Sequence, residues 1–159
     1  MHIILSYKRK DNVKMKIIFF ALLVVILSGC GSSPRFTNNP REGKAPPQIN
    51  YNLYEDSLPV DTVTGVASYY ADKFHGRLTS NGEIYDMFGL TAASPTFPAN
   101  TILRVTNLKN DRSIIIRVND HMPYRPDRII DLSYGTAVEL DMVQDGIANV
   151  MLEILEWGE

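Results

Sequence analysis

An unbroken run of eleven apolar residues, 17–27, divides the chain and limits where a folded domain can lie. A basic stretch ending at Lys16 precedes this run, and the small residues Ser28 and Gly29 follow it. Eleven apolar residues are too few to cross a bilayer, which requires roughly 20. A basic, an apolar and a small-residue segment in this order are typical of an export signal that is removed. Met1 and Met15 are both candidate start residues, because Met15 directly precedes this unit.

Cys30 directly follows the small residues and is the only cysteine in the chain, which excludes an intramolecular disulfide. The string Leu27-Ser28-Gly29-Cys30 resembles the lipobox of bacterial lipoproteins. This resemblance implies that residues 1–29 are a lipoprotein signal peptide and that lipid on Cys30 anchors the chain to a membrane. Gly31 stands where an Asp would indicate retention in the inner membrane, so we expect the outer membrane of the cell envelope, facing the periplasm. The alternative is an ordinary export signal followed by an unmodified cysteine.

Residues 30–61 are rich in Ser, Asn, Pro and Gly and show no apolar period. Such a segment buries too little apolar surface to offset the entropy of ordering it. We therefore expect the lipidated cysteine to be followed by a flexible linker, which would span roughly 30 Å on average. Whether Tyr51 and Tyr54 dock on the following domain stays open at this point.

Residues 62–159 carry the pattern of a small, mainly β domain. Runs rich in β-branched and aromatic residues predict strands at 65–70, 90–93, 102–106, 113–119 and 147–154. Residues 107–112 join two of these runs and predict a hairpin turn, and Ile114, Ile116 and Val118 fall on one face of the next strand. Residues 133–140 predict one helix, with Asp131 or Ser133 as its N-cap. Several short strands and one helix favour a compact barrel.

The distribution of charge excludes nucleic acid as a partner. Residues 1–29 hold five basic side chains and one acidic one, so the rest of the chain carries a formal net charge of −6. Nucleic-acid binding requires a basic surface. No His, Cys or Asp residues have the spacing of a metal site, and no Gly-rich phosphate loop occurs, so we expect neither metal nor cofactor.

Polar clusters interrupt the strand pattern at residues 74–87, 90–94, 117–124 and 127–133. Together with two strand motifs, they supply seven strings in a fixed order: Gly65-x-Ala67-Ser68-x-Tyr70, Phe74-His75-Gly76-Arg77, Asn81-Gly82-Glu83, Thr91-Ala92-Ala93, Arg104-Val105-Thr106-Asn107-Leu108, Val118-Asn119-Asp120 and Arg128-Ile129-Ile130-Asp131-Leu132-Ser133. These strings resemble the rare lipoprotein A (RlpA) family of septal lipoproteins over residues 65–150. The resemblance implies a six-stranded double-psi β-barrel with one or two short helices over residues 62–159.

The same resemblance implies an endolytic lytic transglycosylase. Such an enzyme cuts the β-1,4 bond between N-acetylmuramic acid (MurNAc) and N-acetylglucosamine (GlcNAc) in peptidoglycan strands that lack stem peptides, and it forms 1,6-anhydroMurNAc without water. Glycoside hydrolases usually need two carboxylates. When the sugar's own 6-hydroxyl attacks, one carboxyl can act as acid and then as base. Asp120 matches the family's acid/base residue, and Glu83 matches its supporting carboxylate.

The chain departs from the family pattern at two positions near Asp120. Ser94 stands where the family has a catalytic histidine, and His121-Met122 replaces Arg-Gly before Pro123. A serine hydroxyl can hydrogen-bond to a carboxyl group or a sugar, but it carries no charge near neutral pH. Two functions therefore stay open: an enzyme that uses Asp120, Glu83 and Ser94, or a weak or inactive peptidoglycan-binding septal lipoprotein. A third is a protein that binds cell-division proteins.

The resemblance also places substrate-binding residues around the groove: His75, Arg77, Tyr70 and Asn119. Tyr69 and Tyr70 lie on opposite faces of a predicted strand, so at most one of them can stack on a sugar. For Arg128 and Asp131 the alternative is a structural role, as an internal ion pair or a helix cap.

Overall fold

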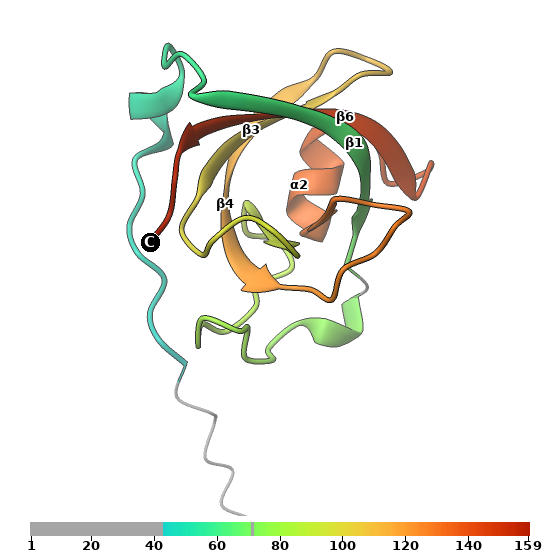
Figure 1. Cartoon of the computed structure of the whole chain (residues 1–159). Coiled ribbons are helices and arrows are strands. Elements are labelled where there is room, and N and C mark those ends of the chain that lie inside the picture. The colour runs from blue at the N-terminus through green and yellow to red at the C-terminus, as the bar shows by residue number, and fades with distance from the viewer. Residues whose placement is uncertain (1–42, 71) are drawn as a thin grey trace, which may run out of the picture. The chain divides into compact units, whose positions relative to one another are not determined.

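The computed structural model describes residues 43–159 except residue 71, and these residues contain a closed barrel of six strands. In chain order the strands are β1 (Asp61–Tyr69), β2 (Thr91–Ser94), β3 (Ile102–Asn107), β4 (Ser113–His121), β5 (Ile130–Leu132) and β6 (Ile147–Glu156). Around the barrel their order is β1-β5-β2-β4-β3-β6, closing back to β1 (Figure 1). The predicted signal peptide and Cys30 lie outside the described residues.

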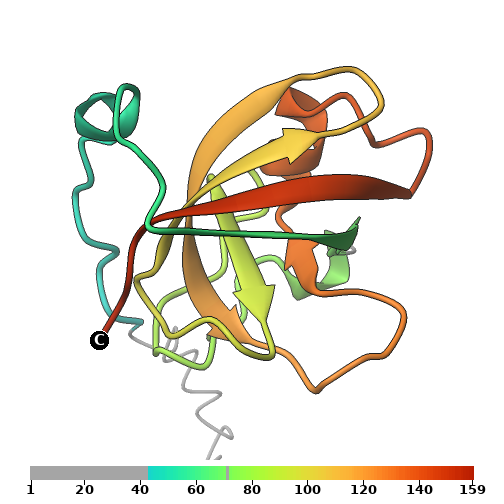
Figure 2. The ribbon, with the colours of Figure 1, turned by 45° about the horizontal axis from the view of Figure 1, so that its top comes forward.

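The sheet mixes parallel and antiparallel pairs. β1 pairs with β5 and β2 pairs with β4 in parallel, whereas the remaining four pairs are antiparallel. Figure 2 shows the long strand β6 running beside β1, with which it shares eight register positions from Asp61 to Ser68. This closed barrel of parallel and antiparallel pairs agrees with the predicted mainly β, six-stranded barrel.

The hairpin and the helix confirm two local predictions. β3 and β4 are joined by a turn in which the Asp111 N–H donates to the Asn107 carbonyl, and Asp111 adopts a positive φ of 58°. The helix α2 (Tyr134–Glu139) begins after Ser133, whose hydroxyl accepts the Thr136 N–H at 3.1 Å. Of the two N-caps considered, the structure therefore selects Ser133.

Strand β5 was not predicted as a strand from its own residues. It has only three residues, and all of them are buried, including the central Asp131. A strand this short has no measurable apolar alternation, and a polar centre is not typical of a buried strand. Its pairing with β1 and β2 on either side, not its local sequence, makes it a strand.

The barrel encloses one apolar core. Ile116 and Val118 of β4 are fully buried in it, and Ile114 packs against it, which confirms the predicted inward face of this strand. Fully buried apolar residues from the other elements complete the core, among them Leu103, Val105, Ile130, Leu132, Leu140, Met142, Val150 and Leu152. Among the described residues, no helix combines the length and the apolar character needed to cross a membrane.

The segment before β1 belongs to the folded unit. It contains the short helix η1 (Tyr51–Tyr54), and the Tyr51 hydroxyl donates to the Leu90 carbonyl at 3.5 Å. The Tyr54 hydroxyl donates to Glu156 at 2.6 Å, and the guanidinium of Arg104 donates to main-chain carbonyls of residues 54, 55 and 57. The flexible linker predicted from composition therefore does not extend over residues 44–57. Hydrogen bonds to distant barrel residues, rather than apolar burial, hold this segment.

Candidate active site

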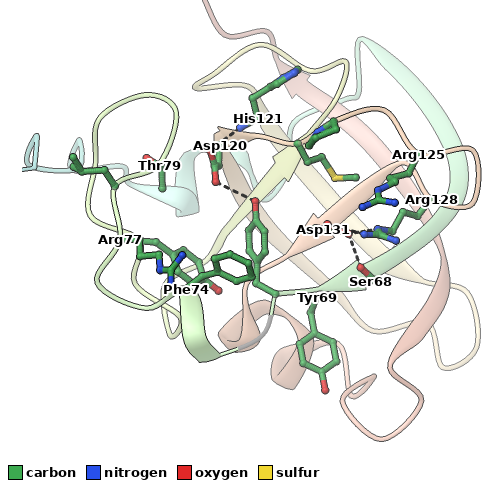
Figure 3. A pocket seen from close by; sticks show the side chains of 15 residues that line it. Ser68, Tyr69, Phe74, Arg77, Thr79, Asp120, His121, Arg125, Arg128 and Asp131 are labelled. Atoms are coloured by element: carbon green, nitrogen blue, oxygen red, sulfur yellow. Dashed lines mark hydrogen bonds and ion pairs between the residues drawn. The ribbon is translucent and has the colours of Figure 1, made fainter.

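A pocket of about 530 Å³ opens beside the end of β4. Five segments line it: the end of β1, the loop that precedes β2, the end of β4, the loop between β4 and β5, and β5 itself (Figure 3). The pocket contains Asp120, the residue that the resemblance identifies as the acid/base, and also Tyr70 and Arg77. Three of the predicted site residues are thus brought together in one cavity.

Asp120 reaches this pocket because the pairing of β4 with β2 is irregular. Strict alternation would place Asp120 on the core face with Val118. The β2–β4 register instead pairs Ala92 with Val118 and Ala93 with Asp120, so Asn119 is an extra residue in β4. Bulges of this kind commonly redirect a side chain next to a functional site.

The Asp120 carboxyl is held by three donors, none of them a charged side chain. The Tyr70 hydroxyl donates to Oδ2 at 3.1 Å, and the main-chain N–H of His121 donates to Oδ1 at 2.8 Å (Figure 3). The main-chain N–H of Ser80 also donates to Oδ1, at 2.7 Å. These bonds orient the carboxyl without placing a positive side chain against it.

Tyr70 supports Asp120 rather than presenting an open face. Its ring packs against Tyr85 and Phe74, with centroid separations of 5.2 and 5.7 Å. Burial, followed by the neighbouring negative charge and hydrogen bond of Asp120, raises the pKa of the Tyr70 hydroxyl far above its ordinary value of 10. The hydroxyl therefore stays protonated and remains a donor to Asp120.

Glu83, the predicted supporting carboxylate, is buried outside the Asp120 pocket. Its Oε2 accepts from Arg117 at 2.6 Å and from Asn119 at 3.2 Å, and its Oε1 accepts from Asn81 at 3.1 Å. Burial alone would raise the pKa of Glu83, but these three hydrogen bonds and the positive charge of Arg117 outweigh it and lower the pKa below 4.5. Glu83 thus carries a fixed negative charge that links its loop to β4.

Ser94 also lies outside the lining of the Asp120 pocket. It is fully buried, and its Oγ accepts the main-chain N–H groups of Thr96 and Phe97, both at 3.1 Å. Its register partner on β4 is His121, an exposed residue that does line the pocket. In this arrangement the Ser94 hydroxyl stabilises the turn after β2.

The two remaining predicted binding residues lie away from the Asp120 pocket. His75 is exposed, and its Nδ1 accepts the main-chain N–H of Met87 at 3.2 Å. Asn119 is buried and donates to Glu83. By contrast, Arg77 lines the pocket and its guanidinium lies 5.4 Å from the centroid of the Phe74 ring.

Sequence reasoning missed Arg125 as a lining residue and gave Arg128 and Asp131 only a structural role. Arg125 follows β4 in an irregular loop, where no periodicity distinguishes it from a surface residue. Arg128 and Asp131 do form the internal pair considered above, with Nε of Arg128 2.7 Å from Oδ1 of Asp131. This pair lines the pocket, where the Ser68 hydroxyl also donates to Asp131.

Within residues 43–159, residue 71 aside, no three His, Cys, Asp or Glu residues gather in a way that would hold a metal ion.

Comparison with known proteins decides the family. The family profile described as "Lytic transglycolase" matches residues 62–152, which is more than half of the chain and covers β2 to β5 together with all of β1 except its first residue. The chain belongs to the RlpA-like lytic transglycolase family. This confirms the resemblance drawn from the seven motif strings, and with it the double-psi barrel.

Two RlpA relatives illustrate the extent of the similarity. The "Endolytic peptidoglycan transglycosylase RlpA" of Vibrio cholerae serotype O1 is 40% identical over 168 residues, a match that covers 88% of this chain and 64% of the relative. The protein of the same name from Campylobacter jejuni is 52% identical over 115 residues, covering 71% of this chain and 42% of the relative. The chain therefore spans less than two thirds of the length of these RlpA relatives.

A solved structure outside the RlpA proteins has a similar fold. The Streptomyces papain inhibitor superposes with a TM-score of 0.50 at 21% identity, covering 64% of this chain and all of the inhibitor. At this identity the match describes the barrel fold and carries no information about the chemistry of the RlpA-like pocket.

Proposed function

We propose that this chain is an endolytic peptidoglycan transglycosylase that cuts MurNAc–GlcNAc bonds in strands lacking stem peptides. Its family and the names of its relatives support this reaction. The observation that carries the proposal is the setting of Asp120, a carboxyl that faces an open pocket and is bound by Tyr70 and two main-chain N–H groups. A carboxyl locked to an arginine, as Glu83 is, would be a poor proton donor to a sugar.

In the proposed reaction, the protonated Asp120 carboxyl gives its proton to the glycosidic oxygen as the bond from C1 of MurNAc breaks. The 6-hydroxyl of the same MurNAc attacks C1, and its proton passes to the Asp120 carboxylate. The products are a 1,6-anhydro end and a free 4-hydroxyl, and Asp120 regains its starting form with no water consumed. The three donors to Asp120 stabilise the carboxylate that exists between these two proton transfers.

The dimensions and lining of the pocket suit a sugar. Its volume lies within the roughly 300–1,000 Å³ range of small-molecule sites. It combines aromatic and apolar side chains, such as Phe74 and Met122, with polar groups that include Arg77 and Asp131. The arrangement offers a hydrophobic surface for a sugar ring and donors for its substituents.

A second candidate function is peptidoglycan binding with weak or no cleavage, and the position of Ser94 favours it. The Ser94 hydroxyl is fully buried and already accepts two N–H groups, so it does not replace a titratable imidazole. In this alternative the barrel is a structural component of the division septum. Cell-division proteins are proposed as further partners of either form.

We also propose that the chain is a lipoprotein, with residues 1–29 as its signal peptide and lipid on Cys30. The apolar run, the lipobox-like string and the position of the single cysteine support this. The proposed location is the outer membrane, facing the periplasm, where the substrate strands lie within reach of a tethered barrel. Metabolic labelling with a palmitate analogue, compared between the native chain and Cys30→Ala, tests the anchor.

The test of the reaction uses sacculi from which an amidase has removed the stem peptides. The full-length chain, purified in detergent, is incubated with these sacculi, and anhydroMurNAc products are measured by mass spectrometry. We expect products with the native chain, none with Asp120→Asn, and unchanged product levels with the matched control Asp141→Asn, whose exposed side chain lies outside the pocket.

Two outcomes of this test contradict the proposal. Equal product yields from the native chain and Asp120→Asn would exclude Asp120 as the acid. Cosedimentation of the native chain with sacculi, without any anhydro products, would instead establish the binding alternative.

A further inference from the structure

The arginines of the described residues fall into two groups. Four of the six lie within 4.0 Å of a carboxylate oxygen: Arg104 with Glu153, Arg112 with Asp141, Arg117 with Glu83, and Arg128 with Asp127 and Asp131. The other two, Arg77 and Arg125, have no carboxylate partner within residues 43–159 (residue 71 aside), and both line the Asp120 pocket.

The two arginines have different surroundings. Arg77 lies against the face of Phe74, which orients its guanidinium without neutralising it. Arg125 and Asp131 line the same pocket, but the Asp131 carboxylate is bound by Arg128 and Ser68. Figure 3 shows Arg77 near Phe74 on the side of the pocket where Asp120 lies, and Arg125 on the other side, beside Arg128. The pocket therefore presents two positive charges without carboxylate partners, one on each side.

We propose that Arg77 and Arg125 bind the lactyl carboxylates of two MurNAc residues, one on each side of the bond that is cut. This inference rests on the proposed function. MurNAc and GlcNAc alternate along the strand, so the two MurNAc residues nearest the cut bond lie on its two sides. A guanidinium binds a carboxylate through paired, charge-assisted hydrogen bonds, which is the geometry that a lactyl carboxylate offers.

The proposed contact also gives a physical basis for choosing strands without stem peptides. In a strand that carries peptides, the lactyl carboxyl is consumed in an amide bond and has no charge. Removing the peptide releases a carboxylate, which creates the group that each arginine requires. An amide in place of the carboxylate leaves the guanidinium without a counter-charge. The two arginines therefore favour strands without stem peptides and disfavour strands that carry them.

The experiment measures binding separately from cleavage. All chains carry Asp120→Asn, and their dissociation constants are measured against three soluble strands of equal length: strands without stem peptides, the same strands with lactyl carboxyls coupled to methylamine, and strands with intact peptides. Arg77→Gln, Arg125→Gln and the double variant are compared with Arg112→Gln, which removes the same charge far from the pocket. Both target arginines are exposed, and thermal unfolding checks that every variant is folded.

We expect coupling to methylamine to weaken binding at least tenfold with both arginines present, although it adds only a small neutral group. Each single variant should lose about tenfold in affinity for uncoupled strands, and the double variant should bind all three strands with similar weak affinity, whereas Arg112→Gln should behave as the parent. A charge-assisted pair contributes enough for a tenfold change.

Three results would overturn the proposal. The parent chain could bind methylamine-coupled strands as tightly as uncoupled ones, or the arginine variants could lose the same affinity for coupled and for uncoupled strands. The third is that peptide-bearing strands bind best, through their peptide carboxylates. Failure of the proposed reaction is distinguishable from these, because it appears only as missing anhydro products in the chain with Asp120 intact.

Discussion

Oε2 of Glu83 accepts a 2.6 Å hydrogen bond from Nη2 of Arg117, and both side chains are almost completely buried. The pair connects the loop before β2 to Arg117 of β4, which lies three residues before Asp120 in the chain. The same loop supplies the Ser80 N–H that donates to the Asp120 carboxyl. We therefore propose that Glu83 is a positioning residue, which acts on Asp120 through the main chain.

Replacement of Glu83 by Gln should be strongly destabilising. The variant keeps the size of the side chain but leaves the buried Arg117 guanidinium without its counter-charge, which costs about 3–5 kcal/mol. Urea unfolding followed by circular dichroism measures the change. The control is Asp145→Asn, which removes the exposed ion pair with Lys109 and should cost less than about 1 kcal/mol. Equal losses in the two variants would contradict a special role for the buried pair.

The same ion pair predicts how stability depends on pH. The pKa of Glu83 is lower in the folded chain than its ordinary value of 4.5, so the unfolded chain binds more protons in this range. The contribution of Glu83 to the free energy of unfolding is complete above about pH 4.5 and is lost as the pH falls through the lower, folded-state pKa. As the pH is lowered from 7 to 3, the free energy of unfolding should fall more steeply for the native chain than for Glu83→Gln. Equal pH dependence in the two chains would show that Glu83 has the same pKa in the folded and unfolded states.

Replacement of Tyr70 by Phe should reduce cleavage at least tenfold with little loss of stability. The variant keeps the ring contacts with Phe74 and Tyr85 but removes the hydroxyl that donates to Asp120. Rates of anhydro product formation measure the effect. Tyr54→Phe removes a hydroxyl whose partner, Glu156, lies outside the pocket, so it should leave the rate unchanged. A native rate for Tyr70→Phe would show that this hydrogen bond does not assist Asp120.

Replacement of Ser94 by Ala should affect stability rather than chemistry. It leaves two main-chain N–H groups, of Thr96 and Phe97, without their acceptor, which should cost about 1–3 kcal/mol. The cleavage rate at a temperature where the variant is fully folded should equal that of the native chain. A lower rate with unchanged stability would show instead that the Ser94 hydroxyl takes part in catalysis.

Replacement of Ser94 by His tests whether the family histidine limits the activity. The β2–β4 register places position 94 one residue beyond the partner of Asp120, so we expect increased product formation. Because Ser94 is fully buried, an imidazole has to displace the turn at residues 96–97, and the melting temperature should fall. An unchanged rate in a folded variant would mean that the missing histidine is not what limits cleavage.

The sequence by itself determined the features that depend on neighbouring residues. The alternation in 113–119 predicted which side of β4 faces the core, the polar residues 107–112 predicted the hairpin, and Ser133 was one of two candidate N-caps. The order of the seven motif strings identified the family, because each string is a local pattern that can be read without knowing its neighbours in space.

Only the tertiary structure decided the features that depend on residues far apart in the chain. Tyr70 and Asp120 are 50 residues apart, and Glu83 and Arg117 are 34 apart, so their contacts exist only because the barrel closes. The same closure turns residues 130–132 into a strand, places Arg104 where it binds the main-chain carbonyls of residues 54, 55 and 57, and brings Arg77 and Arg125 into the pocket of Asp120 without carboxylate partners of their own in the described part of the chain. The sequence specifies the charge of each side chain, but the fold determines which other charges lie next to it.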